Sequence, residues 1–491
     1  MTTVRICAYR LIGSYKRSLQ MVFSSAAFLF VFLPVVLLLY FVPLFKDDKQ
    51  KETTKKNIVL CLSSLVFYAW GEPVYIVLML LSIFYNYNAG IDLENNENEP
   101  KKRKRVFVFA IIFNLLILGF FKYSGFVVEN LNSLFSLNIK YEPMALPVGI
   151  SFYTFQVMSY VIDVYRGDCK TQHSLLNFAT YISMFPQLIA GPIVQYNDVE
   201  KYLFEREHNV RKFAAGSLFF IRGLGKKVIF ANTIGAVYTE ICSGGVSSLT
   251  AVNAWFAILC YTLQIYFDFS GYSDMAVGLG KMFGFDFIHN FNFPYCAVSI
   301  KDFWSRWHIS LSSWFRDYVY IPLGGNRKGT ARTIFNIAVV WTLTGLWHGA
   351  SWNFVAWGAF YGVLLIAEKY VFKDVIEKIP RPVRRVITML IVIIGWVFFS
   401  SETLSSAVEF LRAMFGANGY VSSNTAYLLL NNLFPFAVMT LSALGFFKKL
   451  PSLRNVPLRL TFQAAGYIAV FILCIVFIVS STYNPFLYFR F

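Results

Sequence analysis

Long apolar segments alternate with short polar loops along most of this chain. The first apolar segment runs from Phe23 to Phe45 and is followed by the polar loop KDDKQKETTKK. Two more, Asn57 to Trp70 and Val74 to Ala89, are divided by Gly71-Glu72-Pro73, a sequence that favours a turn. Because about 17 to 25 apolar residues span the hydrocarbon core of a bilayer as a helix, this pattern predicts membrane helices, and the second and third segments form a helical hairpin.

The same pattern continues almost to the end of the chain. The further predicted spans are Val106–Val128, Leu146–Gly167, Phe213–Tyr238, Ala251–Phe269, Tyr272–Phe283, Ile334–Trp347, Trp352–Ile366, Val386–Phe399, Ala426–Phe446 and Thr461–Val479. The segment from Ser174 to Val194 differs, because Pro186 and Gly191-Pro192 interrupt it. Such a break at membrane depth is tolerated only inside protein or beside water, so this segment is predicted to be re-entrant.

These elements predict an all-α polytopic membrane protein with about 11 to 13 membrane helices. No internal repeat, low-complexity linker or soluble domain is visible, so residues 21–491 are expected to form a single membrane domain. The composition agrees, since 57% of the residues are hydrophobic and only 14% are charged. A soluble domain cannot bury that much apolar surface.

The formal net charge of +17 does not indicate nucleic-acid binding. The basic residues gather in short loops between apolar segments, such as KKRKR at 101–105, where the positive-inside tendency places them. The seven cysteines occur singly and form no C-x-x-C pair, so the sequence predicts neither a zinc site nor a disulfide framework.

The first twenty residues conflict with this topology. If both lysine-rich loops face the cytoplasm, the first span must begin outside, yet Arg5, Arg10, Lys16 and Arg17 precede it. No small-residue cleavage site follows a short apolar region, so the extension does not resemble a signal peptide. We hypothesise that residues 1–20 are not translated and that the protein begins at Met21.

The stretch from Trp304 to Gly329, WSRWHISLSSWFRDYVYIPLGGNRKG, is dense in aromatic and basic residues. On one helix, Trp304, His308, Leu311 and Phe315 would share a face. The segment is too polar to span a membrane and too aromatic to leave it, so it is predicted to be an interfacial helix at the cytoplasmic surface. PLGGNRKG is then its exit turn, and its spacing does not match a phosphate-binding Walker loop.

Only five histidines occur, and two of them lie in unusual surroundings. His348 stands within TGLWHGASWNFVAWG, where burying an imidazole is costly unless it is hydrogen-bonded. Polar groups at membrane depth are functional candidates, and His348 and His308 are therefore candidates for the active site. From the residues alone, a structural histidine that joins two helices remains an equal alternative for His348 and the favoured interpretation for His308.

The two histidine segments carry a family resemblance. FWSRWHISLSSWFRDYVYIPLGGNRKG and GLWHGASWNFVAWG resemble the signature of membrane-bound O-acyltransferases, and specifically the bacterial branch that takes part in alginate O-acetylation. LPVGISFYTFQ, YISMFPQLIAGPI, FDFSGYSDMAVGLGKMFGF and NFNFPY resemble that branch in the same order, with a signature core at about 146–362. The likeness runs from Met21 to about Phe415, and it supports the downstream start.

The resemblance implies a fold with a central tunnel and transfer of an acyl group, most simply acetyl, to an extracytoplasmic polysaccharide such as alginate. The donor would be acetyl-CoA or another thioester, with no permanently bound cofactor and no metal. By motif position, His348 corresponds to the catalytic histidine and His308 to the second active-site position. An alcohol is a poor nucleophile, so His348 is expected to be the general base, and His308 would polarise the carbonyl.

Other polar or aromatic residues are weaker candidates for the tunnel or for donor binding: Trp304, Arg306, Arg316, Asp317, Gln156 and Asn353. An ion pair between Arg316 and Asp317 is the simpler interpretation of those two. The expected partners are the lipid bilayer, the polysaccharide and an extracytoplasmic acetyltransferase, in a bacterial inner membrane. Two alternatives stay open: D-alanyl transfer to teichoic acid from a carrier protein, and transport of polymer or acyl donor without chemistry.

Overall fold

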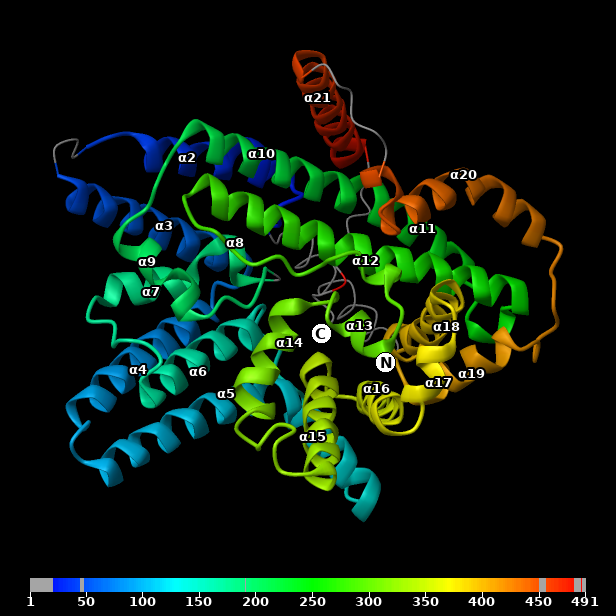
Figure 1. Ribbon diagram of the computed structural model, residues 1–491, viewed down its shortest axis with the longest axis horizontal. Helices are drawn as coiled ribbons and strands as arrows, with labels where there is room; N and C mark the ends of the chain where they lie inside the picture. Colours follow the sequence, from blue (N-terminus) through cyan, green and yellow to red (C-terminus); the bar gives the residue numbers. More distant parts are fainter. Residues whose placement is uncertain (1–20, 45–47, 190, 450–455, 481–486, 488–491) are drawn as a thin grey trace. The chain divides into compact units, whose positions relative to one another are not determined.

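The computed structural model describes residues 21–44, 48–189, 191–449, 456–480 and 487, and within these ranges every regular element is a helix (Figure 1). The predicted N-terminal extension, residues 1–20, lies outside them. The chain forms two compact units. The first ends at Phe220 and also takes in Met275–Phe287, and the second comprises Ile221–Asp274 and Ile288–Phe491.

The first unit contains the N-terminal helices. They are η1 (Phe28–Phe32), α2 (Leu33–Phe41), α3 (Lys49–Gly71), α4 (Ile76–Asn95), α5 (Pro100–Phe135), α6 (Ile150–Arg166), α7 (Leu175–Ser183), α8 (Phe185–Leu188) and α9 (Tyr196–Phe204). Helices α10 (Val210–Gly225) and α12 (Ala251–Met282) contribute residues to both units. The predicted turn does separate α3 from α4, but the two do not form a packed hairpin, because α3 packs mainly against α7 and α4 against α5 and α6. The predicted re-entrant segment is broken between α7 and α8.

The second unit contains the remaining elements. They are η2 (Lys226–Ala231), α11 (Asn232–Ile241), η3 (Val246–Ser248), η4 (Pro294–Cys296), α13 (Ile300–Trp304), α14 (Ile309–Phe315), η5 (Arg316–Tyr320), α15 (Thr330–His348), α16 (Trp352–Tyr370), α17 (Lys373–Lys378), α18 (Arg381–Ser400), α19 (Leu404–Met414), α20 (Thr425–Ala443), η6 (Phe446–Lys449) and α21 (Val456–Ser480).

Helices α4, α5 and α6 pack against one another in the first unit (Figure 1). Asn86 and Asn114 join α4 to α5 through reciprocal amide hydrogen bonds of 3.1 and 2.7 Å, and both side chains are buried. Gly90 lets the ring of Tyr160 on α6 approach α4, because a Cβ there would lie 2.5 Å from the Tyr160 hydroxyl. Small residues and polar side chains hold these apolar helices together, as is typical of membrane helices.

Five described helices are long and apolar enough to cross a bilayer: α4, α5, α18, α20 and α21. Many of their large apolar side chains are exposed, including Phe84, Leu116 and Phe462. Exposed apolar surface on this scale is stable only against lipid or another protein. The protein is therefore a multi-pass, all-α membrane protein, as the hydrophobic pattern predicts.

The structure corrects three details of the predicted elements. Ala251–Phe269 and Tyr272–Phe283 are not separate spans, because α12 continues through Gly271. The KKRKR segment is not a loop but the start of α5. The stretch from Trp304 to Phe315 is not one helix: α13 ends at Trp304, α14 begins at Ile309, and His308 between them has a left-handed backbone.

Candidate active site

His308 lies at the start of α14 in the second unit and is almost fully buried, with 1% of its surface exposed. Its φ of 46° is uncommon for a residue with a side chain. Asn290 holds this turn from both sides. Its backbone oxygen accepts a hydrogen bond from the Ile309 amide at 3.1 Å, and its Oδ1 accepts one from the Ser310 amide at 3.0 Å. The helix therefore breaks where it does because Asn290 binds the amides that follow His308.

His348 is the last residue of α15, and 4% of its surface is exposed. Its position depends on close packing between α15 and α16 within the second unit. A Cβ on Gly345 would lie 2.4 Å from the Phe354 oxygen, and one on Gly358 would lie 2.4 Å from the Trp341 oxygen. These two glycines let the helix backbones touch, which fixes the end of α15 and the imidazole on it.

The indole of Trp347 contacts both imidazoles. Its ring centroid lies 5.9 Å from that of His308 and 4.9 Å from that of His348. Further aromatic rings enclose each histidine: Phe269 stands 4.7 Å from His308, and Trp357 stands 5.1 Å from His348. Two histidines that are forty residues apart in the sequence thus both contact the ring of Trp347.

Burial determines the charge of His308. Its enclosure lowers the pKa of the imidazole from 6.5 to about 3, and a hydrogen bond with its own backbone opposes this only in part. The ring is therefore neutral at physiological pH. A neutral imidazole can donate one hydrogen bond to a carbonyl oxygen and accept another, which fits a group that polarises an acyl donor.

The weaker candidates in the second unit make structural contacts. Arg306 pairs with Asp302 at 2.7 Å, and Arg316 forms a two-point ion pair with Asp317 at 2.7 and 2.9 Å. The amide nitrogen of Asn353 donates to the backbone oxygens of Phe398 and Ser401, at 3.2 and 2.8 Å. The expected Arg316–Asp317 ion pair is present.

Trp304 and Gln156 have different surroundings. Trp304 packs edge-on against Trp357 at 5.5 Å and also against Trp341 and Tyr361, so it belongs to the aromatic wall that continues to His348. Gln156 is buried on α6 of the first unit, and its Oε1 accepts no hydrogen bond from any of the described residues. Roles in a tunnel or in donor binding remain predictions for all of these residues.

Sequence reasoning missed several buried polar residues of the second unit. Asn290 begins NFNFPY, one of the segments that carry the family resemblance, but nothing in its local sequence indicates that it binds the amides after His308. Lys227 and Asp268 form an ion pair of 2.6 Å at 3% and 1% side-chain exposure. Among the described residues, no group of three or more His, Cys, Asp or Glu side chains is placed to hold a metal ion.

Comparison with known proteins identifies relatives that share these segments. Residues 169–405, which include both histidines, match the membrane-bound O-acyltransferase family. A probable alginate O-acetylase of Pseudomonas aeruginosa is 42% identical over 80% of this chain and 75% of its own length. A peptidoglycan O-acetyltransferase of Helicobacter pylori is 34% identical over 83% and 82%. A teichoic acid D-alanyltransferase of Bacillus subtilis is 30% identical, over 44% of this chain and 58% of its own length.

Proposed function

Because this chain belongs to the membrane-bound O-acyltransferase family and is an acyltransferase, we propose that it moves acetyl groups from a cytoplasmic donor across the bacterial inner membrane for O-acetylation of an extracytoplasmic polysaccharide. One observation carries the chemical part of this proposal. Two buried imidazoles from separate elements contact the same Trp347 ring. A charged carrier cannot cross hydrocarbon, so a donor such as acetyl-CoA reaches this site from the cytoplasm and the acceptor hydroxyl reaches it from the other side.

His348 takes the proton of the acceptor hydroxyl as its oxygen attacks the acyl carbon of the thioester. General-base assistance of this kind is worth about 10² to 10⁴ in rate. The neutral ring of His308 donates its N–H to the carbonyl oxygen, which becomes negative as the tetrahedral intermediate forms. Collapse of the intermediate breaks the carbon–sulfur bond, and the departing thiolate receives the proton that His348 has taken. The products are an acetyl ester and a free thiol.

Acetyl transfer is favoured over D-alanyl transfer by the extent of similarity. The two O-acetylating relatives resemble this chain over four-fifths of its length, and the D-alanyltransferase resembles less than half. Alginate and peptidoglycan, which those relatives' names mention, are the two polymer classes to examine first. The acceptor hydroxyl belongs either to the polysaccharide or to a partner acetyltransferase outside the membrane, which then completes the transfer.

The decisive test compares His348→Ala with the unchanged protein in a deletion strain. Ester-linked acetate and alanine are measured in the envelope polymers, and membrane insertion of both proteins is checked by immunoblotting of membrane fractions. We expect acetate to fall to the level of the deletion strain, with alanine unaffected. Retained acetate would exclude His348 as the base, and loss of alanine instead would indicate the teichoic acid reaction. Full activity with both histidines replaced by glutamine would indicate a transporter.

A further inference from the structure

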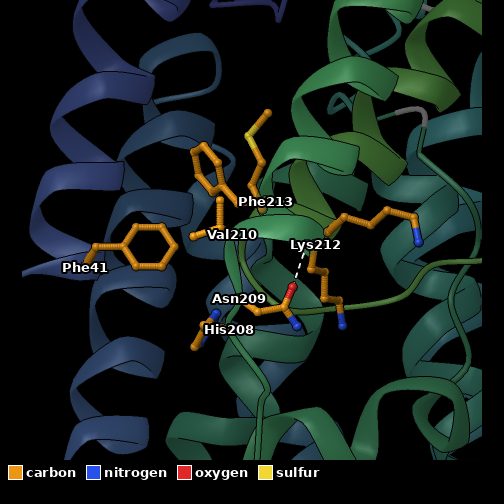
Figure 2. Close-up of a pocket in the computed structure, with 8 residues that line it drawn as sticks. Phe41, His208, Asn209, Val210, Lys212 and Phe213 are labelled. Carbon is orange, nitrogen blue, oxygen red and sulfur yellow. Dashed lines mark hydrogen bonds between the residues drawn. The ribbon is translucent and has the colours of Figure 1, made fainter. Parts of the chain in front are cut away.

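A cavity of about 420 Å³ lies in the first unit, where the end of α2 meets the start of α10 and the end of α12 (Figure 2). Four apolar side chains form much of its wall: Phe41, Val210, Phe213 and Met282. Two of them are unusually accessible, since Val210 is 86% and Phe41 is 38% exposed. The cavity therefore opens to the surroundings of the protein and has an apolar floor.

The polar side of the cavity carries two lysines that share one carboxylate. Lys212 Nζ lies 2.8 Å from Asp286 Oδ2, and Lys281 Nζ lies 2.9 Å from Asp286 Oδ1. The lysine side chains are only 18% and 22% exposed, while that of Asp286 is 43% exposed. Because the carboxylate is the most accessible member, an incoming anion can replace it without moving buried groups.

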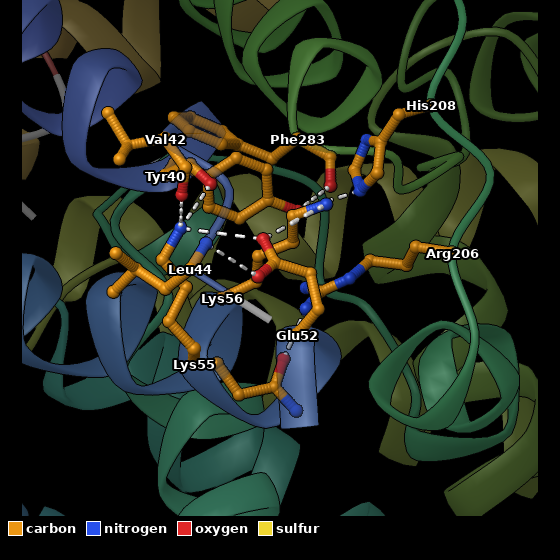
Figure 3. Close-up of polar contacts among 10 residues, drawn as sticks. Tyr40, Val42, Leu44, Glu52, Lys55, Lys56, Arg206, His208 and Phe283 are labelled. Carbon is orange, nitrogen blue, oxygen red and sulfur yellow. Dashed lines mark hydrogen bonds and ion pairs between the residues drawn. The ribbon is translucent and has the colours of Figure 1, made fainter. Parts of the chain in front are cut away.

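A second cationic group lies around Tyr40 and His208, and His208 also lines the cavity (Figure 3). Lys55 and Lys56 both approach Glu52, at 3.5 and 3.8 Å, and all three side chains are at most 17% exposed. The Arg206 guanidinium stands over the rings of Tyr40 and Phe285, 5.7 and 4.8 Å from their centroids.

We use the name cationic cluster for the basic residues of both groups, Lys55, Lys56, Arg206, Lys212 and Lys281. Their carboxylate partners in the described contacts are Glu52 and Asp286. The cationic cluster therefore has more positive than negative side chains.

His208 connects the cationic cluster to the cavity. It lines the cavity, and its Nε2 lies 3.3 Å from the hydroxyl of Tyr40, which itself donates to the Phe283 oxygen at 2.7 Å. Burial, assisted by the charges of Lys56, Arg206 and Lys212, lowers the pKa of His208 to about 4. The imidazole is therefore neutral at physiological pH and lies among cationic side chains.

Exposed apolar side chains follow α2 as far as the cavity. Val35, Leu38 and Leu39 are 49%, 66% and 51% exposed, and the helix ends at Phe41 on the cavity wall. An apolar helix that ends beside clustered lysines is the arrangement expected at the headgroup level of a membrane leaflet that carries anionic lipids.

We propose that this cavity binds an anionic phospholipid, with its phosphate on Lys212 and Lys281 and the first carbons of an acyl chain against Phe41, Phe213 and Met282. The phosphate displaces Asp286 from the two lysines and offsets part of the excess charge of the cationic cluster. The apolar wall distinguishes a lipid from a soluble phosphate compound, which would gain nothing from contact with phenylalanine and methionine. Neither His308 nor His348 lines this cavity, so the proposed lipid binding does not depend on the proposed acetyl transfer.

The test measures lipid binding to the purified full-length protein in detergent by native mass spectrometry. Phosphatidylglycerol is compared with phosphatidylcholine, which carries the same phosphate but no net charge. We expect a preference for phosphatidylglycerol, and we expect Lys212→Gln/Lys281→Gln to weaken its binding by at least about tenfold, since two charge-assisted contacts are lost. The matched control is Lys373→Gln/Lys378→Gln on the exposed helix α17, which removes the same charge elsewhere and should bind as the unchanged protein does.

A second variant keeps the test informative if the double lysine variant does not fold. Asp286→Asn removes the competing carboxylate and leaves both lysines in place, so it should bind phosphatidylglycerol more tightly than the unchanged protein. Equal binding of the two lipids, or unchanged binding in Asp286→Asn, would overturn the proposal. So would displacement of phosphatidylglycerol by inorganic phosphate or coenzyme A at equal concentration, because the site would then recognise a soluble phosphate.

Discussion

Replacing Gly345 by alanine tests whether the contact between α15 and α16 positions His348. The added Cβ would lie 2.4 Å from the Phe354 backbone oxygen, whereas ordinary van der Waals contact begins at 3.4 Å. The obstacle is backbone on a packed helix, so no side chain can rotate away. The two helices must separate by about 1 Å, and overpacking of this kind typically costs about 1 to 3 kcal/mol of stability.

The consequence for catalysis should exceed the consequence for folding. His348 lies less than one helical turn beyond Gly345, so it moves with the displaced end of α15. A misplacement of about 1 Å at a reacting group can lower the rate about 100-fold. We therefore expect Gly345→Ala to insert into the membrane, to melt a few degrees lower, and to lose nearly all polymer acetylation.

The assay compares ester-linked acetate in envelope polymers from a deletion strain that expresses each variant at equal level. Gly119→Ala on α5 is the matched control, because a Cβ there has no heavy atom within 4 Å and alanine is favoured over glycine inside a helix. Normal acetylation by Gly345→Ala would refute the reasoning that this close contact positions the base. Equal loss in Gly119→Ala would show that the assay reports membrane insertion rather than geometry.

Two further predictions concern His308. Asn290→Ala removes the side-chain acceptor of the Ser310 amide, so we expect a stability loss of about 1 to 3 kcal/mol and a fall in turnover with little change in the apparent KM for the donor, measured with labelled acetyl donor in membranes. An unchanged turnover would mean that Asn290 does not position His308. The second concerns pH: the folded pKa of about 3 lies below 6.5, so between these values the unfolded chain binds the proton and stability falls as the pH falls. At pH 5.5 the loss from this group is on the order of 1 kcal/mol, and thermal unfolding of His308→Gln should show a correspondingly shallower pH dependence.

The long elements could be predicted from the sequence because their physical cause is local. A run of apolar residues long enough for a bilayer, interrupted at Gly71-Glu72-Pro73, already predicts that α3, α4 and α5 exist. Their ends were predicted less well, because α3 begins eight residues before Asn57, and α5 begins six residues before Val106 and ends seven after Val128. The predicted elements were wrong where a contact with a residue distant in the sequence overrides the local pattern. Gly271 resembles a break in the sequence, yet α12 continues through it because a glycine there lets α12 approach the backbone of Gly223.

The break at His308 shows why the active site was harder to predict than the spans. Spacing alone places Trp304, His308 and Leu311 on one helical face, and that inference is sound only while backbone hydrogen bonds stay within the helix. Asn290 supplies competing acceptors from eighteen residues upstream, and no periodicity in the sequence reports such a contact. The sequence indicated which residues belong to the site. It could not show that they meet at Trp347, because this depends on the left-handed turn at His308 and on the close contact between Gly345 and Gly358. Positions that break a local rule, such as a left-handed histidine, are therefore where function is most reasonably sought in this chain.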